Sequence, residues 1–148
     1  KMESLQVKIK LQEGALLPKR VNEYASGYDC YAHMIPDVID CTIIRPGENS
    51  LISLGFSMEI PVGYEARVRS RSGLGKDGIC ILHGTIDCDY RGVVMANVFN
   101  HSFKHFSVRD GMRICQIEIQ KVESVEFVAV DELSETERGI KGFGSSGL

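Results

Sequence analysis

The stretch RICQIEIQKV, residues 113–122, decides the fold. It is rich in isoleucine, and from Cys115 to Gln120 apolar and polar residues alternate with a period of two. Because successive side chains of a β-strand point to opposite faces of the sheet, this pattern is typical of a strand with one buried face. The stretch therefore predicts a strand that carries a glutamine, Gln116, within an otherwise apolar run. That glutamine is either half-buried and hydrogen-bonded or simply directed outward.

The same two-residue period recurs along the chain. LQVKIKL at 5–11 alternates cleanly, and YEARVRS at 64–70, VVMANVFN at 93–100 and VEFVAV at 125–130 are rich in β-branched or aromatic residues. Turn signals made of proline, glycine and aspartate separate them, such as Asp77-Gly78 and Asp110-Gly111. Many short strands at turn spacing predict an all-β protein, either an antiparallel barrel or a double-sheet jelly roll.

The length of 148 residues predicts one domain with a sizeable core. The composition shifts once, at DELSETE, residues 131–137, which carries four acids and is followed by a stretch rich in glycine and serine. We expect a body over residues 1–130 and an acidic linker with a C-terminal arm over residues 131–148, belonging to the same domain. Glycine and serine predict that this arm is flexible.

Composition argues against several classes of protein. The start KMESLQVKIK has no signal-peptide pattern, and no apolar run is long enough to span a membrane, which predicts a soluble intracellular protein without a membrane partner. The net charge of −3 argues against direct binding of nucleic acid. The five cysteines include no C-x-x-C pair, so free reduced thiols are expected.

Two stretches carry candidate chemistry. In RVRSRSGLGKDG, residues 67–78, the three arginines alternate, so Arg67, Arg69 and Arg71 should share one face of a strand that leads into Ser72-Gly73. This pattern suits either a phosphate site or a solvated basic surface. In HGTIDCDYRG, residues 83–92, Asp87 and Asp89 would point the same way on an extended backbone. The two carboxylates could serve as a general base with its orienting partner or as metal ligands, or they could belong to an ordinary polar hairpin end.

Taken in order, five short segments resemble the motifs of the trimeric dUTPases. They are ASGYDCYA at 25–32, RSGLGKDG at 71–78, GTIDCDYRG at 84–92, GMRICQIEI at 111–119 and RGIKGFGSSG at 138–147. The resemblance covers nearly the whole chain. It implies a distorted jelly roll of the β-clip type with a mobile C-terminal arm. It also implies magnesium-assisted hydrolysis of dUTP to dUMP and pyrophosphate, which keeps dUTP low and supplies dUMP for thymidylate synthesis.

The resemblance also implies a role for each matching residue. Asp87 would activate the water that attacks the α-phosphorus, and Tyr90 would pack against the deoxyribose and exclude a 2′-hydroxyl. The backbone of the hairpin at 80–84, with Gly84, would read uracil. Asp29 would reach Mg²⁺ through water, although a lone aspartate in a turn is more often a backbone cap. The remaining substrate contacts implied are Arg71, Ser72, Gly73 and Gln116 for the phosphates, Arg138, Gly144, Ser145 and Ser146 for the γ-phosphate, and Phe143 for stacking on uracil.

The family resembled is a homotrimer with shared active sites, so the expected partners are dUTP and two further copies of the chain. The sequence departs from the usual motifs at several positions. Cys30 stands for a usual leucine, Cys115 for a usual alanine, and Met112 for an acid that normally organises the local turn. Two alternatives remain open from the sequence: a dCTP deaminase on the same fold, and a dUTPase-like domain that only binds proteins.

Overall fold

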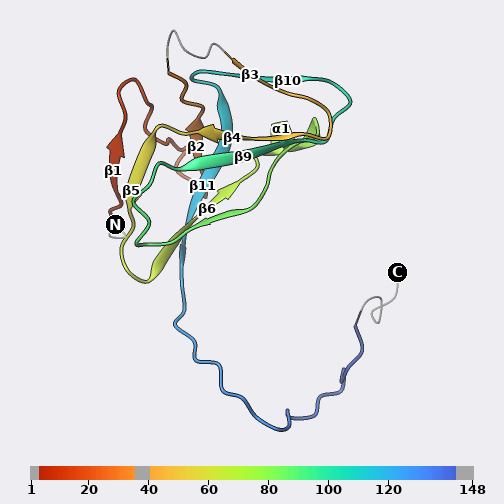
Figure 1. The fold of residues 1–148 in the computed structure, drawn as a ribbon. Helices are drawn as coiled ribbons and strands as arrows, with labels where there is room; N and C mark the ends of the chain where they lie inside the picture. Colours follow the sequence, from red (N-terminus) through yellow and green to blue (C-terminus); the bar gives the residue numbers. More distant parts are fainter. Residues whose placement is uncertain (1–3, 36–40, 143–148) are drawn as a thin grey trace.

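The computed structural model describes residues 4–35 and 41–142. These residues form short strands and one helical turn (Figure 1). In chain order the elements are β1 Lys8–Leu11, β2 Tyr28–Tyr31, β3 Cys41–Ile44, β4 Asn49–Ser53, β5 Phe56–Glu59, β6 Tyr64–Arg69, α1 Ser72–Lys76, β7 Ile79–Ile81, β8 Gly84–Ile86, β9 Met95–Asn100, β10 Phe106–Arg109 and β11 Arg113–Lys121. The structure is therefore mostly β, as the alternating pattern predicts.

The longest strand, β11, lies inside a four-stranded antiparallel sheet with the order β2-β11-β6-β8. Its two neighbours align with it so that Asp29 of β2, Gln116 of β11 and Arg69 of β6 lie side by side across three strands. The stretch 113–122 thus positions residues from three different sequence motifs on one sheet.

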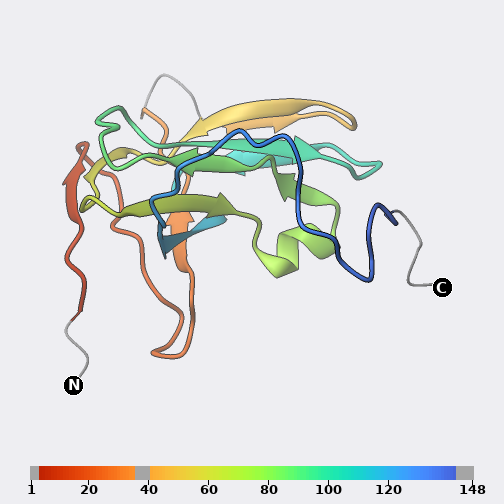
Figure 2. The same ribbon diagram turned by 90° about the horizontal axis from the view of Figure 1, so that it is seen from below.

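A second antiparallel sheet has the order β4-β9-β7, and two pairs of strands, β1-β5 and β10-β3, complete the body. Figure 2 shows these strands stacked in layers rather than laid out in one plane. The layers enclose a core of aliphatic residues with Phe56 at its centre, which is fully buried. Burial of this apolar surface is the main term that stabilises the body.

The one-turn helix α1, which follows β6, is not among the elements that the sequence predicts. Two local predictions also need correction. The first strand begins at Lys8 rather than Leu5. The stretch 80–84 is not a hairpin, because β7 pairs with β9 and β8 pairs with β6, so Leu82 and His83 carry the chain from one sheet to the other.

The chain leaves the body at the end of β11. The amide of Val122 donates to Gly63 O at 2.8 Å, and every described side chain from Glu123 to Gly142 is exposed. We call residues 123–142 the C-terminal extension, and Figure 1 shows it running away from the sheets. The segment 125–130, which the sequence predicts as a strand, has no strand partner in the described structure and is not a strand. A strand needs a neighbour to satisfy its backbone groups, and residues 4–35 and 41–142 supply none to this segment.

No helix within the described ranges has the length and apolar character needed to cross a membrane.

Candidate active site

The first group of functional residues is centred on a buried carboxylate. Asp29 of β2 is only 7% exposed, and its two oxygens face two arginines. Nε of Arg71 donates to Oδ1 at 3.0 Å, and Nη1 of Arg113 donates to Oδ2 at 3.3 Å. Arg71 also donates from Nη1 to the carbonyl of Arg113 at 3.3 Å, which ties the two arginines together. A buried carboxylate with this much positive charge around it is held in one orientation.

Sequence reasoning missed Arg113, and the reason is a β-bulge. The pairing between β11 and β2 shifts between Arg113 and Cys115, so two consecutive residues, Ile114 and Cys115, both point into the core. Strict alternation from Gln116 would direct Arg113 to the opposite face. The extra residue restores it to the face of Asp29, as bulges often do beside functional sites. The two consecutive apolar residues before Gln116 are the signal that could have revealed it.

Gln116 itself is held against the same group. Its Nε2 donates to the carbonyl of Ser70 at 2.9 Å, next to Arg71. A methyl group at Gly27 would lie 2.8 Å from Cδ of Gln116 and closer still to its amide oxygen. Gly27 is therefore required at this point because the glutamine side chain occupies the space that any Cβ would fill. Sequence reasoning missed this glycine as well.

The three alternating arginines do not form an uncompensated basic face. Arg67 pairs with Glu65 at 2.5 Å, and Arg69 faces Glu118 of β11 at 3.5 Å. Arg71 lies beyond the strand, at the start of α1, and its partner is Asp29. Ser72 and Gly73, the first residues of α1, are exposed beside it. Only Arg71 of the three therefore joins the buried carboxylate.

A second group of residues lines a separate cavity of about 230 Å³. Its walls include Gly84 at the start of β8, Asp87 and Tyr90 in the turn that follows, and Val68 and Val94. Asp87 is exposed, and Tyr90 is 46% exposed. The chain turns after Asp87, because the amide of Tyr90 donates to the Asp87 carbonyl at 3.1 Å. The extended backbone that would direct Asp87 and Asp89 the same way is therefore absent here, which corrects that expectation.

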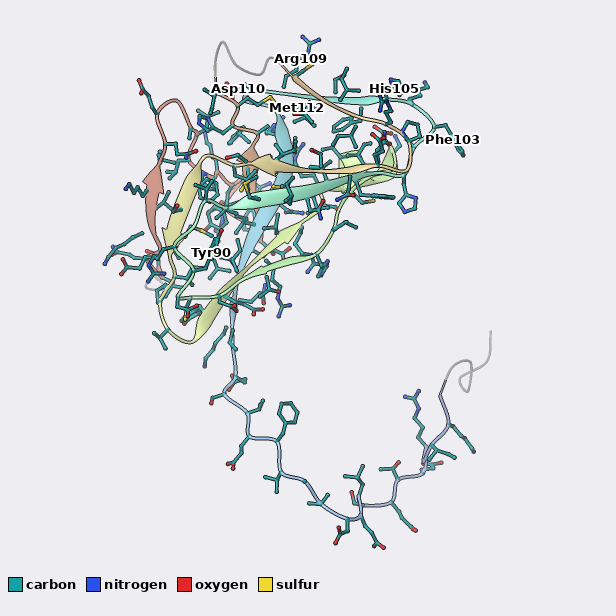
Figure 3. All side chains as sticks on the ribbon, in the orientation of Figure 1. Tyr90, Phe103, His105, Arg109, Asp110 and Met112 are labelled. Carbon is teal, nitrogen blue, oxygen red and sulfur yellow. The ribbon has the colours of Figure 1, made fainter. Side chains whose placement is uncertain are left out.

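Within one chain Asp87 of the second group lies at the opposite end of β6 from Arg71, whereas Gly84 of the same cavity pairs with Val68 near the Arg71 end. Ile86 pairs with Ala66 near the start of β6, whereas Arg71 follows the end of β6. At about 3.3 Å per residue, the strand separates Asp87 from Arg71 by roughly 20 Å. In Figure 3 the label of Tyr90 is likewise far from that of Met112, which directly precedes β11. Among the described residues no hydrogen bond or ion pair connects the two groups.

The remaining candidates lie at the C-terminus. Arg138 is exposed in the C-terminal extension, where its Nε donates to the carbonyl of Lys141 at 2.9 Å. It contacts neither of the two groups in its own chain. Phe143, Gly144, Ser145 and Ser146 lie outside the described residues.

The departures at Cys30 and Cys115 turn out to be a pair. The two residues are register partners on β2 and β11, and both are fully buried with free thiols. The neighbouring Cys115 and burial both raise the pKa of the Cys30 thiol far above its usual range. Two thiols therefore fill the core directly behind Asp29 and Gln116.

The departure at Met112 is explained by a neighbouring acid. Asp110 accepts the amide of Met34 through Oδ1 at 2.8 Å, and the amide of Met112 closes the turn by donating to the Arg109 carbonyl at 3.1 Å. Gly111 supplies the positive φ of 70° that this turn requires. Met112 packs against the core instead. Asp110, two residues before Met112, thus ties the turn to Met34, and a backbone hydrogen bond closes the turn.

The mostly β body thus carries two groups of candidate residues, the carboxylate held by two arginines and the cavity lined by Asp87 and Tyr90. A sequence model of the dUTPase family matches residues 13–147. A deoxyuridine 5′-triphosphate nucleotidohydrolase of Nautilia profundicola is 46% identical over 141 residues, which are 93% of this chain and 95% of that protein. The chain belongs to the dUTPase family.

Solved structures agree on the fold. A mutant dUTPase of Staphylococcus bacteriophage 80alpha with dUpNHpp has a TM-score of 0.85 at 26% identity, and it covers 97% of this chain and 99% of its own. A mutant dUTPase from phage phi11 of S. aureus, described with a structural Mg(II) ion, has a TM-score of 0.76 at 21% identity, over 86% of this chain and 97% of its own. At that identity the likeness concerns the fold alone. The expected dUTPase-like fold is confirmed.

Proposed function

We propose that this dUTP diphosphatase hydrolyses dUTP to dUMP and pyrophosphate in active sites shared between copies of the chain. The observation that carries the proposal is the separation of Asp87 from Arg71 along β6. One end of the sheet offers guanidinium groups suited to phosphates, and the other offers a free carboxylate beside a small cavity. Since roughly 20 Å separates them in one chain, a triphosphate can contact both only if they come from different copies. The family resembled, a homotrimer with shared sites, has this arrangement.

In this proposal Arg71, Ser72, Gly73 and Gln116 contact the phosphates of dUTP. Asp29 and the carbonyl of Arg113 hold the guanidinium of Arg71 in place, so little ordering is required when an anion arrives. Ser72 and Gly73 are exposed next to it and offer a hydroxyl and backbone N–H groups. Gln116 reaches the same place through its bond to the Ser70 carbonyl.

The surroundings of Asp29 suit contact with Mg²⁺ through a bound water rather than direct coordination. Both carboxylate oxygens already accept from arginines, and the described residues contain no group of three or more potential metal ligands. Each oxygen keeps a lone pair that can accept from a metal-bound water. When bound with the triphosphate, Mg²⁺ supplies positive charge that offsets the phosphate oxygens, and it prefers phosphate and water ligands to an all-protein cage. We therefore propose Asp29 as an outer-sphere residue.

Asp87 is the proposed general base. Its exposed carboxylate accepts a proton from a water, whose oxygen forms a bond to the α-phosphorus. The bond from that phosphorus to the bridging oxygen breaks, and pyrophosphate leaves with the electron pair. The carboxylate is free for this role because none of the described hydrogen bonds or ion pairs engages it. Asp29, in contrast, is buried and forms an ion pair with each of two arginines.

Tyr90 and the backbone at 80–84 are proposed to select the sugar and the base. Tyr90 lines the same cavity as Asp87 and Gly84, so its ring can pack on a deoxyribose bound there. A rigid ring excludes a 2′-hydroxyl sterically, which an apolar pocket alone does only modestly. The crossing from β7 to β8 leaves backbone groups available to read uracil, with Gly84 at its end.

The C-terminal arm, residues 131–148, is proposed to close a site formed by other copies. The C-terminal extension, residues 123–142, includes the first part of this arm. It carries apolar side chains that are exposed in the described structure, namely Val125, Phe127, Val128, Val130 and Leu133. Such a segment is stabilised when it packs on an identical neighbour. Arg138, Gly144, Ser145 and Ser146 would then reach the γ-phosphate, and Phe143 would stack on uracil.

Replacing Gly27 with alanine should weaken phosphate binding through Gln116. The new methyl group overlaps the Gln116 side chain, so the glutamine must swing away from the Ser70 carbonyl. We expect kcat/KM for dUTP to fall by about tenfold to a hundredfold, the worth of one hydrogen bond to a charged group. Gly75→Ala is a matched control, since a methyl group there meets nothing within 4 Å. Equal kcat/KM values for the two variants would remove Gln116 from the site.

The proposed function is tested by measuring pyrophosphate release from dUTP, dTTP, dCTP and UTP side by side with Mg²⁺. We expect rapid release from dUTP alone, because the base and the sugar are both selected. Addition of EDTA should abolish it. Ammonia release from dCTP would identify a deaminase instead, and the absence of any turnover would favour a domain that only binds proteins.

A further inference from the structure

The turn that carries Asp87 and Tyr90 contains a glycine that no role above explains. A methyl group at Gly92 would lie 2.5 Å from Cζ and 2.9 Å from Cε2 of the Tyr90 ring, and closer still to its hydroxyl oxygen. Ordinary van der Waals contact between carbon atoms is about 3.5–4.0 Å, so this overlap is severe. Gly92 has no positive φ to explain its presence, which leaves the tyrosine ring as the structural reason for a glycine.

The ring is seated on Gly92 by a hydrogen bond at its far end. The Tyr90 hydroxyl donates to the carbonyl of Val93 at 3.2 Å, so the ring folds back over Gly92. A glycine at 92 allows this approach, and any other residue blocks it. The hydrogen bond and the glycine together set where the ring stands in the cavity.

The backbone of the turn is held independently of the ring. The Tyr90 amide donates to the Asp87 carbonyl, and Nη1 of Arg91 donates to the carbonyls of Cys88 at 2.7 Å and Tyr90 at 3.2 Å. These bonds resist a shift of the backbone. A side chain added at 92 will therefore displace the ring of Tyr90 rather than the carboxylate of Asp87.

We propose that Gly92 is a specificity-determining residue that acts by positioning the ring of Tyr90. The inference rests on the proposed function, in which that ring excludes ribonucleotides. A ring displaced by a side chain at 92 leaves room for a 2′-hydroxyl while Asp87 keeps its place. Gly92 touches no part of the substrate in this account and is a positioning residue.

The test compares kcat/KM for dUTP and UTP in Gly92→Ala, with Gly75→Ala as the glycine control. We expect the ratio of kcat/KM for dUTP to kcat/KM for UTP to fall by about tenfold in Gly92→Ala. The same ratio should stay unchanged in Gly75→Ala, whose methyl group is unobstructed. Tyr90→Phe, which adds no bulk, removes the bond to Val93 and should lower the ratio in the same direction but less. This variant keeps the test decisive if Gly92→Ala folds poorly.

A double-mutant cycle distinguishes the proposed role of Gly92 from the proposed role of Tyr90, on which it rests. In a Tyr90→Ala background, Gly92→Ala should change the ratio no further, because its effect passes through the ring. An unchanged ratio in both Gly92→Ala and Tyr90→Phe, with a lowered ratio in Tyr90→Ala, would overturn the role of Gly92 alone. An effect of Gly92→Ala that persists without Tyr90 would also overturn it. An unchanged ratio in Tyr90→Ala would remove the proposed role of Tyr90 and the inference with it.

Discussion

Asp87→Asn should lower kcat for dUTP by about a thousandfold, within the range that a positioned general base contributes. The amide that replaces the carboxylate has nearly the same shape but cannot accept a proton from the attacking water. The structure gives Asp87 no described side-chain partner, so the substitution leaves no buried charge unpaired and should not destabilise the fold. The measurement is single-turnover hydrolysis, together with the affinity for dUpNHpp, which should stay within a few-fold of the unmodified protein.

Asp89→Asn is the matched control for this variant. Asp89 lies two residues away in the same turn and is also exposed, but the proposed mechanism gives it no role. Its turnover should match that of the unmodified protein. Wild-type-like turnover in Asp87→Asn, or an equal loss in Asp89→Asn, would show that the base is a different group.

Deleting residues 138–148 should lower kcat/KM by about a hundredfold or more while the protein still assembles. The deletion removes Arg138 and Phe143, and with them the proposed contacts to both ends of dUTP and the closure that excludes bulk water. It keeps the exposed apolar side chains at 125–130, which are the groups proposed to pack on a neighbouring copy. Steady-state kinetics and light scattering on the same sample measure the two effects separately.

A shorter truncation that removes only Gly147 and Leu148 provides the control, because it leaves every proposed contact in place. It should be close to fully active. If the long deletion were equally active, the arm would have no part in turnover. A long deletion found as a monomer would instead place the assembly contacts after residue 137 rather than before it.

The sequence predicted the strands best where one face is buried against the chain itself. The stretches 64–70, 93–100 and 113–122 match β6, β9 and β11 to within two residues at each end, because alternation reports burial directly. The segment 125–130 is as rich in β-branched and aromatic residues as these strands, but it is exposed and pairs with no strand among the described residues. Residue type alone does not reveal whether a segment finds a neighbouring strand.

The sequence was sufficient to single out candidate site residues but not to predict which of them contact one another. Motif resemblance singled out Asp29, Arg71 and Gln116, and the structure brings these three together. Nothing in the spacing shows that Asp29 and Arg71, 42 residues apart, share an ion pair. Arg113 was hidden by a bulge that reverses the alternation. The sequence did not reveal the roles of Gly27 and Gly92. Each leaves space for the side chain of another residue, and only the folded structure shows which residue that is.

The buried thiol pair has a consequence for how this sequence can vary. Cys30 and Cys115 face each other across β2 and β11, and both are fully buried. In a closely packed interior, a larger side chain at one of two facing positions requires a smaller one at the other. We therefore expect a leucine at position 30 to be tolerated better when position 115 is an alanine than when it is a cysteine. The two positions should then vary as a pair rather than independently.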